Sequence, residues 1–388
     1  MTITTDMLLG LLALLVTLLI GIAVGIAFEA ARTRRARASA PGTGEAAAAP
    51  EAPAGPDPQD QSAPARAAGG MRRAAIVLNP VKAHADFRAS AAAVCREAGW
   101  DDPLVIETEE EDPGTEMARE ALAAGVDVVV AAGGDGTVRH VAEQLVHTGV
   151  PLGIVPLGTG NLLARNLSIV LGRPEWALRT ALWGVDTSMD VAHAQLSPEG
   201  EDHVFLVMAG LGFDAAVMAD TNDALKTRVG WLAYVEAGSR KLLGNRTKVS
   251  LRFDDKEPEE TRVRSVLGGN CGKVQGGLEL LPGAKVDDGI LDVLIVSPKN
   301  LADWFGVIAS VVGRRRRGLH TEITPCSRVV IEAEDEMEVQ LDGDPCGETA
   351  YLAMEIDPGS LVVRTAGEEL RRRIRAADWP VPFGYTND

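Results

Sequence analysis

Short apolar runs alternate with amphipathic segments in the first half of the chain. The apolar runs fall at residues 74–78, 103–106, 126–132 and 153–155. Continuous runs of this length are typical of strands that are buried on both faces. Helical periodicity is found between them, at 115–124 and 139–148. This alternation predicts an open α/β sheet of parallel strands, wound by right-handed crossovers.

The pattern changes after residue 183, where short β-type segments replace the alternation. Turn sequences such as SPEG at 197–200 separate these segments. They predict a second, mainly antiparallel β domain over residues 188–365, interrupted by helices at 223–243 and 301–312. A helix is also expected at 368–377, packed back on the first domain. We therefore assign the first domain to residues 73–187 together with 366–388.

An uncharged apolar stretch occupies residues 7–28. At about 1.5 Å per residue it is long enough to cross a hydrocarbon core of about 30 Å, so it predicts a transmembrane helix before the two domains. Arginines follow it at positions 32, 34, 35 and 37, and the positive-inside rule then places the rest of the chain in the cytoplasm. The expected location is the cell membrane, as a single-pass protein with cytoplasmic folded domains.

The remaining composition constrains linkers and partners. Residues 29–72 are rich in Ala, Pro, Gly and Glu and predict a flexible linker. Gly21 and Gly25 form a small-xxx-small pair through which two predicted membrane helices could associate as a homodimer.

The net charge of −17 argues against a nucleic-acid partner, because phosphate backbones attract an excess of basic groups. Four widely spaced cysteines indicate neither a zinc site nor a disulfide framework.

Two glycine-rich loops follow neighbouring predicted strands and carry the strongest chemical signal. They are GGDGT at residues 133–137 and GTGN at 158–161. Glycines let backbone N–H groups approach an anion, and the helix that follows adds the positive end of its dipole. One such loop is equally well an ordinary glycine turn, but two at one sheet edge indicate a nucleotide cleft in a Rossmann-like domain. Neither loop matches the Walker or the dinucleotide-binding pattern.

These loops belong to a longer series of motifs in a specific order. The series is Asn79-Pro80, GGDGT at 133–137, PLGTGNLLARNL at 156–167, AGLGFDA at 209–215, LLPGAKVDDGILDVLIV at 280–296 and LDGD at 341–344. Together the motifs resemble the diacylglycerol kinase catalytic-domain family, which includes bacterial lipid kinases and sphingosine kinases. The resemblance implies an enzyme that uses ATP and Mg²⁺ to phosphorylate the hydroxyl of diacylglycerol or a similar membrane lipid, giving phosphatidic acid. It makes the β domain the lipid-substrate domain.

Two other functions fit parts of the pattern. NAD kinases also carry GGDGT, although the apolar span at 7–28 and the segments GTGNLLARNL and PGAKVDDG are against that assignment. A non-catalytic sensor of lipid or nucleotide is the other alternative, because two of the motifs are altered.

The resemblance implies which residues bind ATP and metal. The ATP-binding residues are Asn79, Pro80, Thr108, Gly133, Gly134, Asp135, Gly136, Thr137, Gly158, Thr159 and Asn161. Thr137 is also expected to cap the helix that follows it. A structural Mg²⁺ is implied at Asp288, with the backbone carbonyls of Lys285 and Ile290. The D-D-G sequence at 287–289 is equally compatible with a plain hairpin turn.

The resemblance also implies three catalytic aspartates. Asp344 takes the place of the catalytic base, Asp342 precedes it in the same motif, and Asp135 would organise a magnesium-bound phosphate. The family has Glu where this chain has Asp344, whose side chain is one carbon shorter. A competing interpretation makes Asp342 and Gly343 a type I′ turn that leaves Asp344 in solvent. Asp190, at the start of the second domain, is a further acidic residue expected near the cleft.

Three basic segments depart from the family pattern or lie outside its motifs. Lys82 follows Asn79-Pro80 where small residues are usual, and it could add a positive charge there. Arg139 and His140 replace Asn-Glu after GGDGT; Arg139 could reach a phosphate or be solvated, and His140 is expected to be structural. The arginines at 314–317 could bind an anionic membrane surface, or cover a helix C-terminus in solvent.

Overall fold

The computed structural model describes residues 71–212, 246–274, 278–300 and 303–376, all of which belong to one compact unit. The predicted membrane span at 7–28, most of the linker at 29–72, the helix expected at 223–243 and the tail beyond 376 lie outside the described residues.

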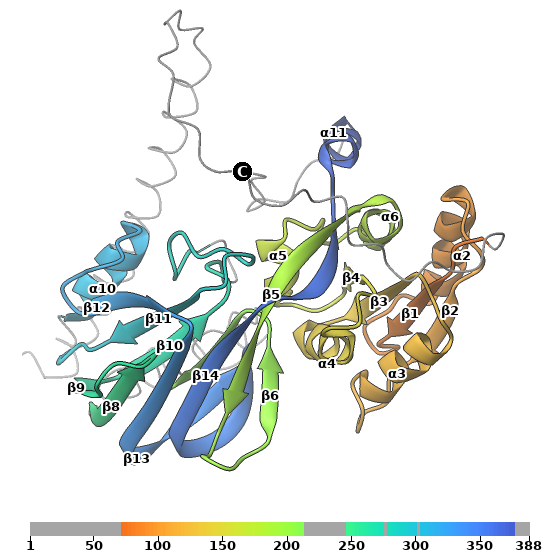
Figure 1. The fold of residues 1–388 in the computed structure, drawn as a ribbon. Coiled ribbons are helices and arrows are strands. Elements are labelled where there is room, and N and C mark those ends of the chain that lie inside the picture. Colours follow the sequence, from red (N-terminus) through yellow and green to blue (C-terminus); the bar gives the residue numbers. More distant parts are fainter. Residues whose placement is uncertain (1–70, 213–245, 275–277, 301–302, 377–388) are drawn as a thin grey trace, which may run out of the picture. The chain divides into compact units, whose positions relative to one another are not determined.

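Four parallel strands form the centre of the first domain (Figure 1). They are β1 (Ala74–Leu78), β2 (Leu104–Glu107), β3 (Val128–Gly133) and β4 (Leu152–Pro156), and their order in the sheet is β4-β3-β1-β2. β1, β3 and β4 are buried along their whole length, as their continuous apolar runs require. The predicted open parallel sheet is confirmed.

Five helices accompany these strands. They are α2 (Phe87–Glu97), α3 (Thr115–Ala123), α4 (Asp135–Leu145), α5 (Leu162–Asn166) and α6 (Pro174–Trp183). α2 contacts α6 and α3 contacts α4, and Figure 1 shows these two pairs on opposite sides of the parallel strands. α4 begins four residues earlier than its periodicity predicts, because Gly134 serves as its N-cap. The first turn of α4 therefore contains most of the GGDGT motif.

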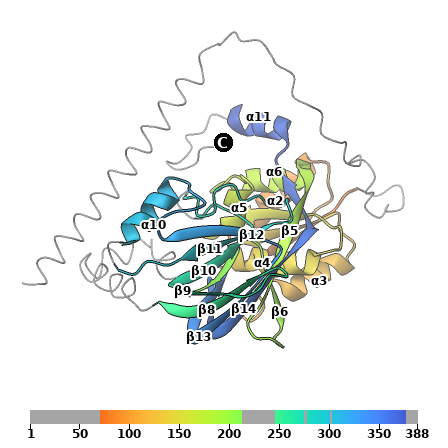
Figure 2. The ribbon, with the colours of Figure 1, turned by 60° about the vertical axis from the view of Figure 1, so that its left-hand side comes forward.

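The second domain is mainly antiparallel, as predicted. Its strands are β5 (Val185–Gln195), β6 (Asp202–Phe205), β7 (Met208–Leu211), β8 (Thr247–Phe253), β9 (Glu259–Val263), β10 (Ser265–Gly269), β11 (Leu291–Val296), β12 (Thr321–Cys326), β13 (Arg328–Leu341) and β14 (Asp344–Thr365). β12, β11, β10, β7, β13 and β14 are neighbours in that order, with β5, β6, β8 and β9 attached at β14 and β13. Figure 2 shows β12, β11 and β10 side by side near α10. Two further helices are α10 (Asp303–Val312) and α11 (Glu368–Ala376).

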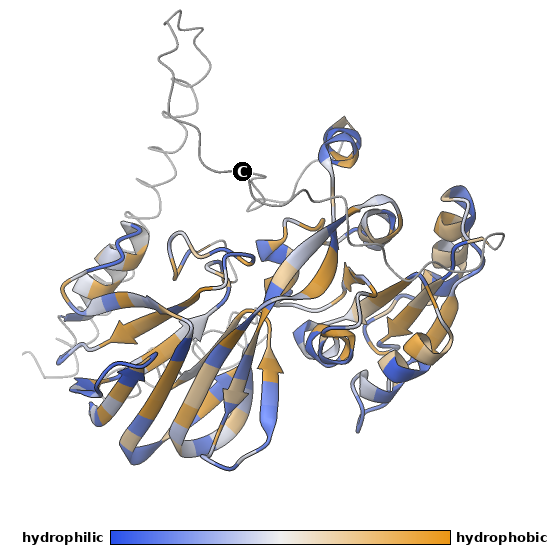
Figure 3. Cartoon of the chain, viewed as in Figure 1, coloured by the Kyte–Doolittle hydropathy of each residue, from blue (hydrophilic) through white to orange (hydrophobic). Residues whose placement is uncertain are grey.

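Burial along these strands differs from that in the first domain. In β8, Val249, Leu251 and Phe253 are buried while the residues between them are not. Strands of the second domain accordingly mix hydrophilic and hydrophobic residues, whereas β1 is almost uniformly hydrophobic (Figure 3). A half-buried antiparallel sheet needs apolar residues on one face only.

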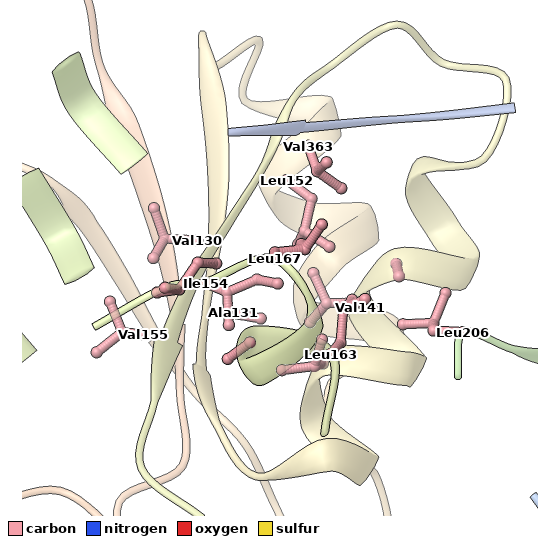
Figure 4. Close-up of a cluster of buried hydrophobic side chains, with 14 of the residues drawn as sticks. Val130, Ala131, Val141, Leu152, Ile154, Val155, Leu163, Leu167, Leu206 and Val363 are labelled. Carbon is pink, nitrogen blue, oxygen red and sulfur yellow. The ribbon is translucent and has the colours of Figure 1, made fainter. Parts of the chain in front are cut away.

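One long strand, β14, joins the strands of the two domains into one continuous sheet. It pairs antiparallel with β13 and β5, and near its end it pairs parallel with β4, where Val363 stands beside Leu152. Figure 4 shows both residues in a cluster that also contains Leu163 of α5 and Leu206, which lies between β6 and β7. The core of the first domain thus continues into the second. This continuity fixes the β13–β14 turn relative to the glycine-rich loops.

The structure corrects the predicted localisation as a single-pass protein of the cell membrane with cytoplasmic domains. No helix among the described residues is long and apolar enough to cross a membrane. The longest, α2 and α4, have 11 residues each. At about 1.5 Å per residue this is roughly half of a hydrocarbon core of about 30 Å. No described element therefore supports that location.

Candidate active site

The loops after β1, β3 and β4 meet at the carboxyl edge of the parallel sheet. In the sheet, β1 lies between β2 and β3. The connection after β1 leads to β2 on one side, and the connection after β2 leads back to β3 on the other side. Open α/β sheets bind ligands at the carboxyl ends of strands where the order reverses in this way. Hydrogen bonds continue beyond the strand ends: Asn79 N–H donates to the Ala132 carbonyl at 2.9 Å, and Leu157 N–H donates to the Gly133 carbonyl at 2.8 Å. The predicted ATP-binding loops are thus held side by side.

Glycine is required where the two loops touch. A β-carbon on Gly158 would lie 2.7 Å from the α-carbon of Gly134, and one on Gly133 would lie 2.5 Å from the side chain of Thr137. Real β-carbons essentially never make contacts shorter than 3.0 Å, so a side chain at Gly158 would push the two loops apart and one at Gly133 would displace the Thr137 side chain. The loops therefore pack directly on each other and keep their N–H groups accessible from one side.

Asp135 connects the two loops. Its Oδ2 accepts the N–H of Asn161 at 2.7 Å and its Oδ1 accepts the N–H of Leu162 at 2.6 Å. Asn161 is left-handed, with φ of 48°, and exchanges two hydrogen bonds with Gly158. The pKa of the Asp135 carboxyl is raised, chiefly by burial and further by the nearby Asp344 carboxylate, although the two N–H groups act to lower it. The residue expected to organise a phosphate also holds the loop that precedes α5.

Positive charge gathers at the start of α4. Gly134 is the N-cap, and Thr137 lies buried in the first turn, so the expectation that Thr137 caps this helix is wrong. Lys82 comes from the exposed loop after β1 and places its Nζ directly against Gly134. The ammonium group and the positive end of the helix would both stabilise an anion here.

The other predicted ATP-binding residues lie on the loops after β1, β2 and β4. Asn79 Oδ1 accepts the N–H groups of Val81 at 3.2 Å and Lys82 at 3.3 Å, and so forms the turn that directs Lys82. Thr108 is buried after β2 and donates its N–H to the Leu78 carbonyl at 2.8 Å. Pro80 and Thr159 are exposed.

The turn between β13 and β14 brings Asp344 to the same place. Asp342 and Gly343 have φ values of +51° and +92°, and Leu341 pairs with Asp344, as in a type I′ turn. Oδ2 of Asp344 lies 3.4 Å from the position of a β-carbon on Gly136. The turn predicted as an alternative does form, yet it directs Asp344 onto the GGDGT loop.

Asp342 has a structural role. Its Oδ1 accepts the N–H groups of Val207 at 2.8 Å and Met208 at 3.0 Å, and its Oδ2 accepts that of Leu206 at 2.9 Å. Burial raises the pKa of the Asp342 carboxyl to about 6, although the three N–H groups act to lower it. Both oxygens are engaged inside the protein. These contacts show that Asp342 holds the turn that carries Asp344, and a catalytic part for Asp342 stays a prediction.

Arg139 is a site residue whose place the sequence left open. Its side chain is only 14% exposed, and its Nη2 donates to Oδ2 of Asp344 at 2.9 Å, so the solvated alternative is wrong. His140 is half-buried, with Nδ1 at 3.3 Å from Oγ1 of Thr115, which agrees with a structural role. The expected position of Arg139 at the start of a helix was the only sequence signal, and it could not reveal a partner 205 positions away.

The predicted metal turn is exposed at Lys285, Asp288 and Ile290. Oδ1 of Asp288 accepts the N–H of Ile290 at 3.2 Å, and the N–H of Gly289 donates to Oδ2 of the buried Asp190 at 2.6 Å. Within the described residues, no cluster of three or more His, Cys, Asp or Glu side chains could hold a metal. A site with one carboxylate and two carbonyls is not such a cluster, so Mg²⁺ at Asp288 stays a prediction. Asp190 also accepts the N–H of Gly359 at 2.7 Å, so its carboxylate supports the turn.

Three of the four arginines at 314–317 pair within the chain. Their partners are Glu279 for Arg314, Asp292 for Arg316 and Glu322 for Arg317. These pairs lower the positive charge available to an anionic membrane surface. That partner stays a prediction.

Family models match most of the folded chain. Residues 73–194 match the diacylglycerol kinase catalytic domain, and residues 207–365 match the YegS C-terminal NAD kinase beta sandwich-like domain. The chain therefore belongs to the diacylglycerol kinase catalytic-domain family of lipid kinases, as its motifs indicate. Membership in a kinase family implies that ATP is the phosphoryl donor.

Relatives agree with this assignment. A "Probable lipid kinase YegS-like" of Chromohalobacter salexigens is 33% identical over 292 residues, which cover 74% of this chain and 91% of that protein. A diacylglycerol kinase of Bacillus subtilis is 30% identical over 281 residues, which cover 71% and 90%. The crystal structure of a diacylglycerol kinase from Bacillus anthracis shares the fold, with a TM-score of 0.58 and 21% identity over 77% of this chain and 98% of that one. Nothing in these matches supports the predicted membrane span.

Proposed function

We propose that this lipid kinase transfers the γ-phosphoryl group of ATP to the hydroxyl of diacylglycerol, giving phosphatidic acid. The observation that carries the proposal is the meeting of Asp344 with Gly136 at the start of α4. A carboxylate from the second domain lies where the glycine-rich loops of the first would hold phosphates. The names of the relatives support a lipid acceptor.

The nucleotide would bind across the strand ends. The triphosphate would accept hydrogen bonds from N–H groups at the start of α4, and the Lys82 ammonium would neutralise part of its charge. Gly134 and Gly158 have no side chains that would fill this space. Asn79 and Thr108, on the loops after β1 and β2, would lie toward the nucleoside.

The donor groups at this point suit a magnesium ion. The charge of the Asp344 carboxylate adds to burial in raising the pKa of Asp135, so the two acidic groups repel each other. A divalent cation would relieve this repulsion, and Mg²⁺ is commonly bound by one or two carboxylates together with phosphate oxygens. When bound, it would neutralise charge on the phosphoryl group in transit.

Asp344 would act as the base. The hydroxyl oxygen of the lipid forms a bond to the γ-phosphorus, the bond from that phosphorus to the β,γ-bridging oxygen breaks, and the hydroxyl proton passes to Asp344. The loose transition state makes this transfer late, so the carboxylate mainly orients the alcohol. Its half-exposed side chain, at 50%, is open to such an acceptor.

The test is a radiolabelled ATP assay on the full chain with mixed micelles of diacylglycerol, sphingosine or phosphatidylglycerol, and with NAD in parallel. We expect label in diacylglycerol, and a loss of about 10²-fold or more in kcat for Asp344→Asn. The matched control is Asp335→Asn, an exposed carboxylate on β13, which should keep full activity. Label in NAD alone would reassign the protein to NAD kinases, and ATP binding without any transfer would make it a sensor.

A further inference from the structure

We propose that Arg139 is a positioning residue for Asp344, and that its guanidinium group holds the carboxylate in the orientation needed to accept the hydroxyl proton. The inference rests on the proposed function, because it gives the proposed base a partner. It concerns a cation on α4 and a carboxylate at the first residue of β14.

The two side chains are unequally buried. Nη2 of Arg139 donates to Oδ2 of Asp344 at 2.9 Å, and the exposed fractions of the side chains are 14% and 50%. The arginine is therefore fixed by its surroundings, while the carboxylate keeps one side open to solvent. The contact occupies Oδ2, so Oδ1 is left to accept a proton from an alcohol.

This pair differs from the exposed ion pairs of the same strands. Arg328 and Glu355 pair across β13 and β14 at 3.6 Å, with side chains 53% and 61% exposed, and such pairs contribute little. Arg139 instead has its Nε buried without a hydrogen-bond partner among the described residues. Burying a guanidinium group costs free energy, because the group loses its contacts with water. The negative charge of Asp344 offsets this cost.

The charge of Arg139 also acts on Cys346, two residues after Asp344. Burial raises the pKa of the Cys346 thiol and the nearby guanidinium lowers it, which agrees with a position of Arg139 beside the start of β14. The type I′ turn sets the backbone of Asp344, and Arg139 sets its side-chain torsions. A short, half-exposed aspartate without this partner would sample several rotamers.

The experiment uses the full chain and the variant Arg139→Ala. We expect kcat for diacylglycerol phosphorylation to fall about 10²-fold, with the KM for ATP changed no more than about twofold, because the variant loses orientation rather than nucleotide binding. Millimolar guanidinium chloride should restore kcat at least tenfold, since the free cation can enter the vacated space. Sodium chloride and urea at equal concentrations should not.

Matched variants separate positioning from folding. Arg328→Ala, which removes the exposed pair, should keep wild-type kcat and show no response to guanidinium. Asp344→Asn should not be rescued, and the double variant with Arg139→Ala should be no slower than Asp344→Asn alone, because residues that act as a unit are not additive.

Two results would overturn the inference while leaving the proposed function intact. One is wild-type kcat in Arg139→Ala. The other is a loss of activity that guanidinium does not restore and that parallels a lower unfolding midpoint, which would show a structural role. A wild-type chain that labels no lipid would instead refute the proposed function, and the inference with it.

Discussion

Asp342 and Asp344 stand two positions apart in one motif, and the fold gives them opposite environments. Asp342 is buried with three N–H groups on its carboxylate, whereas Asp344 is half-exposed and faces Gly136 and Arg139. Three backbone N–H groups hold the Asp342 carboxylate inside the protein, whereas the Asp344 side chain is half-exposed. One carboxylate of the motif thus lies in the core and the other beside the glycine-rich loop.

The buried aspartate makes stability depend on pH. The folded pKa of Asp342 is raised from 3.8 to about 6, so its contribution to stability is fully present below about pH 4 and is lost as pH rises through about 6. The difference corresponds to on the order of 3 kcal/mol. The asparagine side chain in the Asp342→Asn variant has no ionisable group, so this position contributes no pH dependence in the variant. We expect the free energy of unfolding of the wild type, relative to Asp342→Asn, to fall between about pH 4 and pH 7 in urea titrations. A relative stability that is constant or rises over this interval would contradict the burial argument.

At the scale of elements, the candidate nucleotide site is made by two loops that pack without side chains between them. β3 and β4 are neighbours in parallel register, with Gly133 beside Pro156, so the loops that follow them leave the sheet together. Asp135 then joins the first loop to the start of α5. The close approach of Gly134 and Gly158 keeps the N-terminus of α4 open.

Two alanine substitutions test this contact with different expected outcomes. In Gly158→Ala the new methyl group would meet the backbone of Gly134 at 2.7 Å, so the loops must separate. ATP affinity should fall about tenfold or more, or about 1.4 kcal/mol. In Gly134→Ala the methyl group meets the end of Lys82, a flexible side chain that can move, so the loss should be smaller. Calorimetric titration with ATP measures both, and equal affinities for the two variants would refute the backbone contact.

At the scale of the whole described unit, β14 carries the second domain into the sheet of the first. Leu361 of β14 is fully buried in the cluster that extends from β1 into the second domain. The same strand begins at Asp344 and pairs with β4 near its other end. The positions of Asp344 and of the glycine-rich loops therefore depend on one shared core.

A shared core predicts a single unfolding transition. Leu361→Ala should lower the free energy of unfolding by about 2–5 kcal/mol, because it leaves a cavity in a packed interior. Far-UV circular dichroism and tryptophan fluorescence should report the same midpoint in wild type and variant. ATP at about 100 times its Kd should stabilise both by about 2.7 kcal/mol. Separate transitions for the two signals would show that the domains unfold independently.

Much of the fold and of the nucleotide site follows from local sequence. Apolar runs at β1, β3 and β4 predict buried parallel strands, because burial on both faces requires continuous hydrophobicity. The glycine-rich loops predict an anion site, because only glycine allows such close backbone approach. The ordered motifs also indicate the family that the comparisons confirm. An apolar run was less informative at residues 7–28, where it led to the membrane location that the described structure does not support.

The roles of individual charged residues were decided by tertiary structure. Sequence by itself determined that the LDGD turn carries two carboxylates, but not which one is buried. Nor could it show that Arg139 meets Asp344 across 205 positions, or that Lys82 folds over Gly134. The spacing of hydrophobic residues and the preference for glycine in tight loops depend on residues that are close together in the sequence. The environment of a charge is set instead by whichever distant segment packs against it, and here that segment was brought by β14 and its shared core.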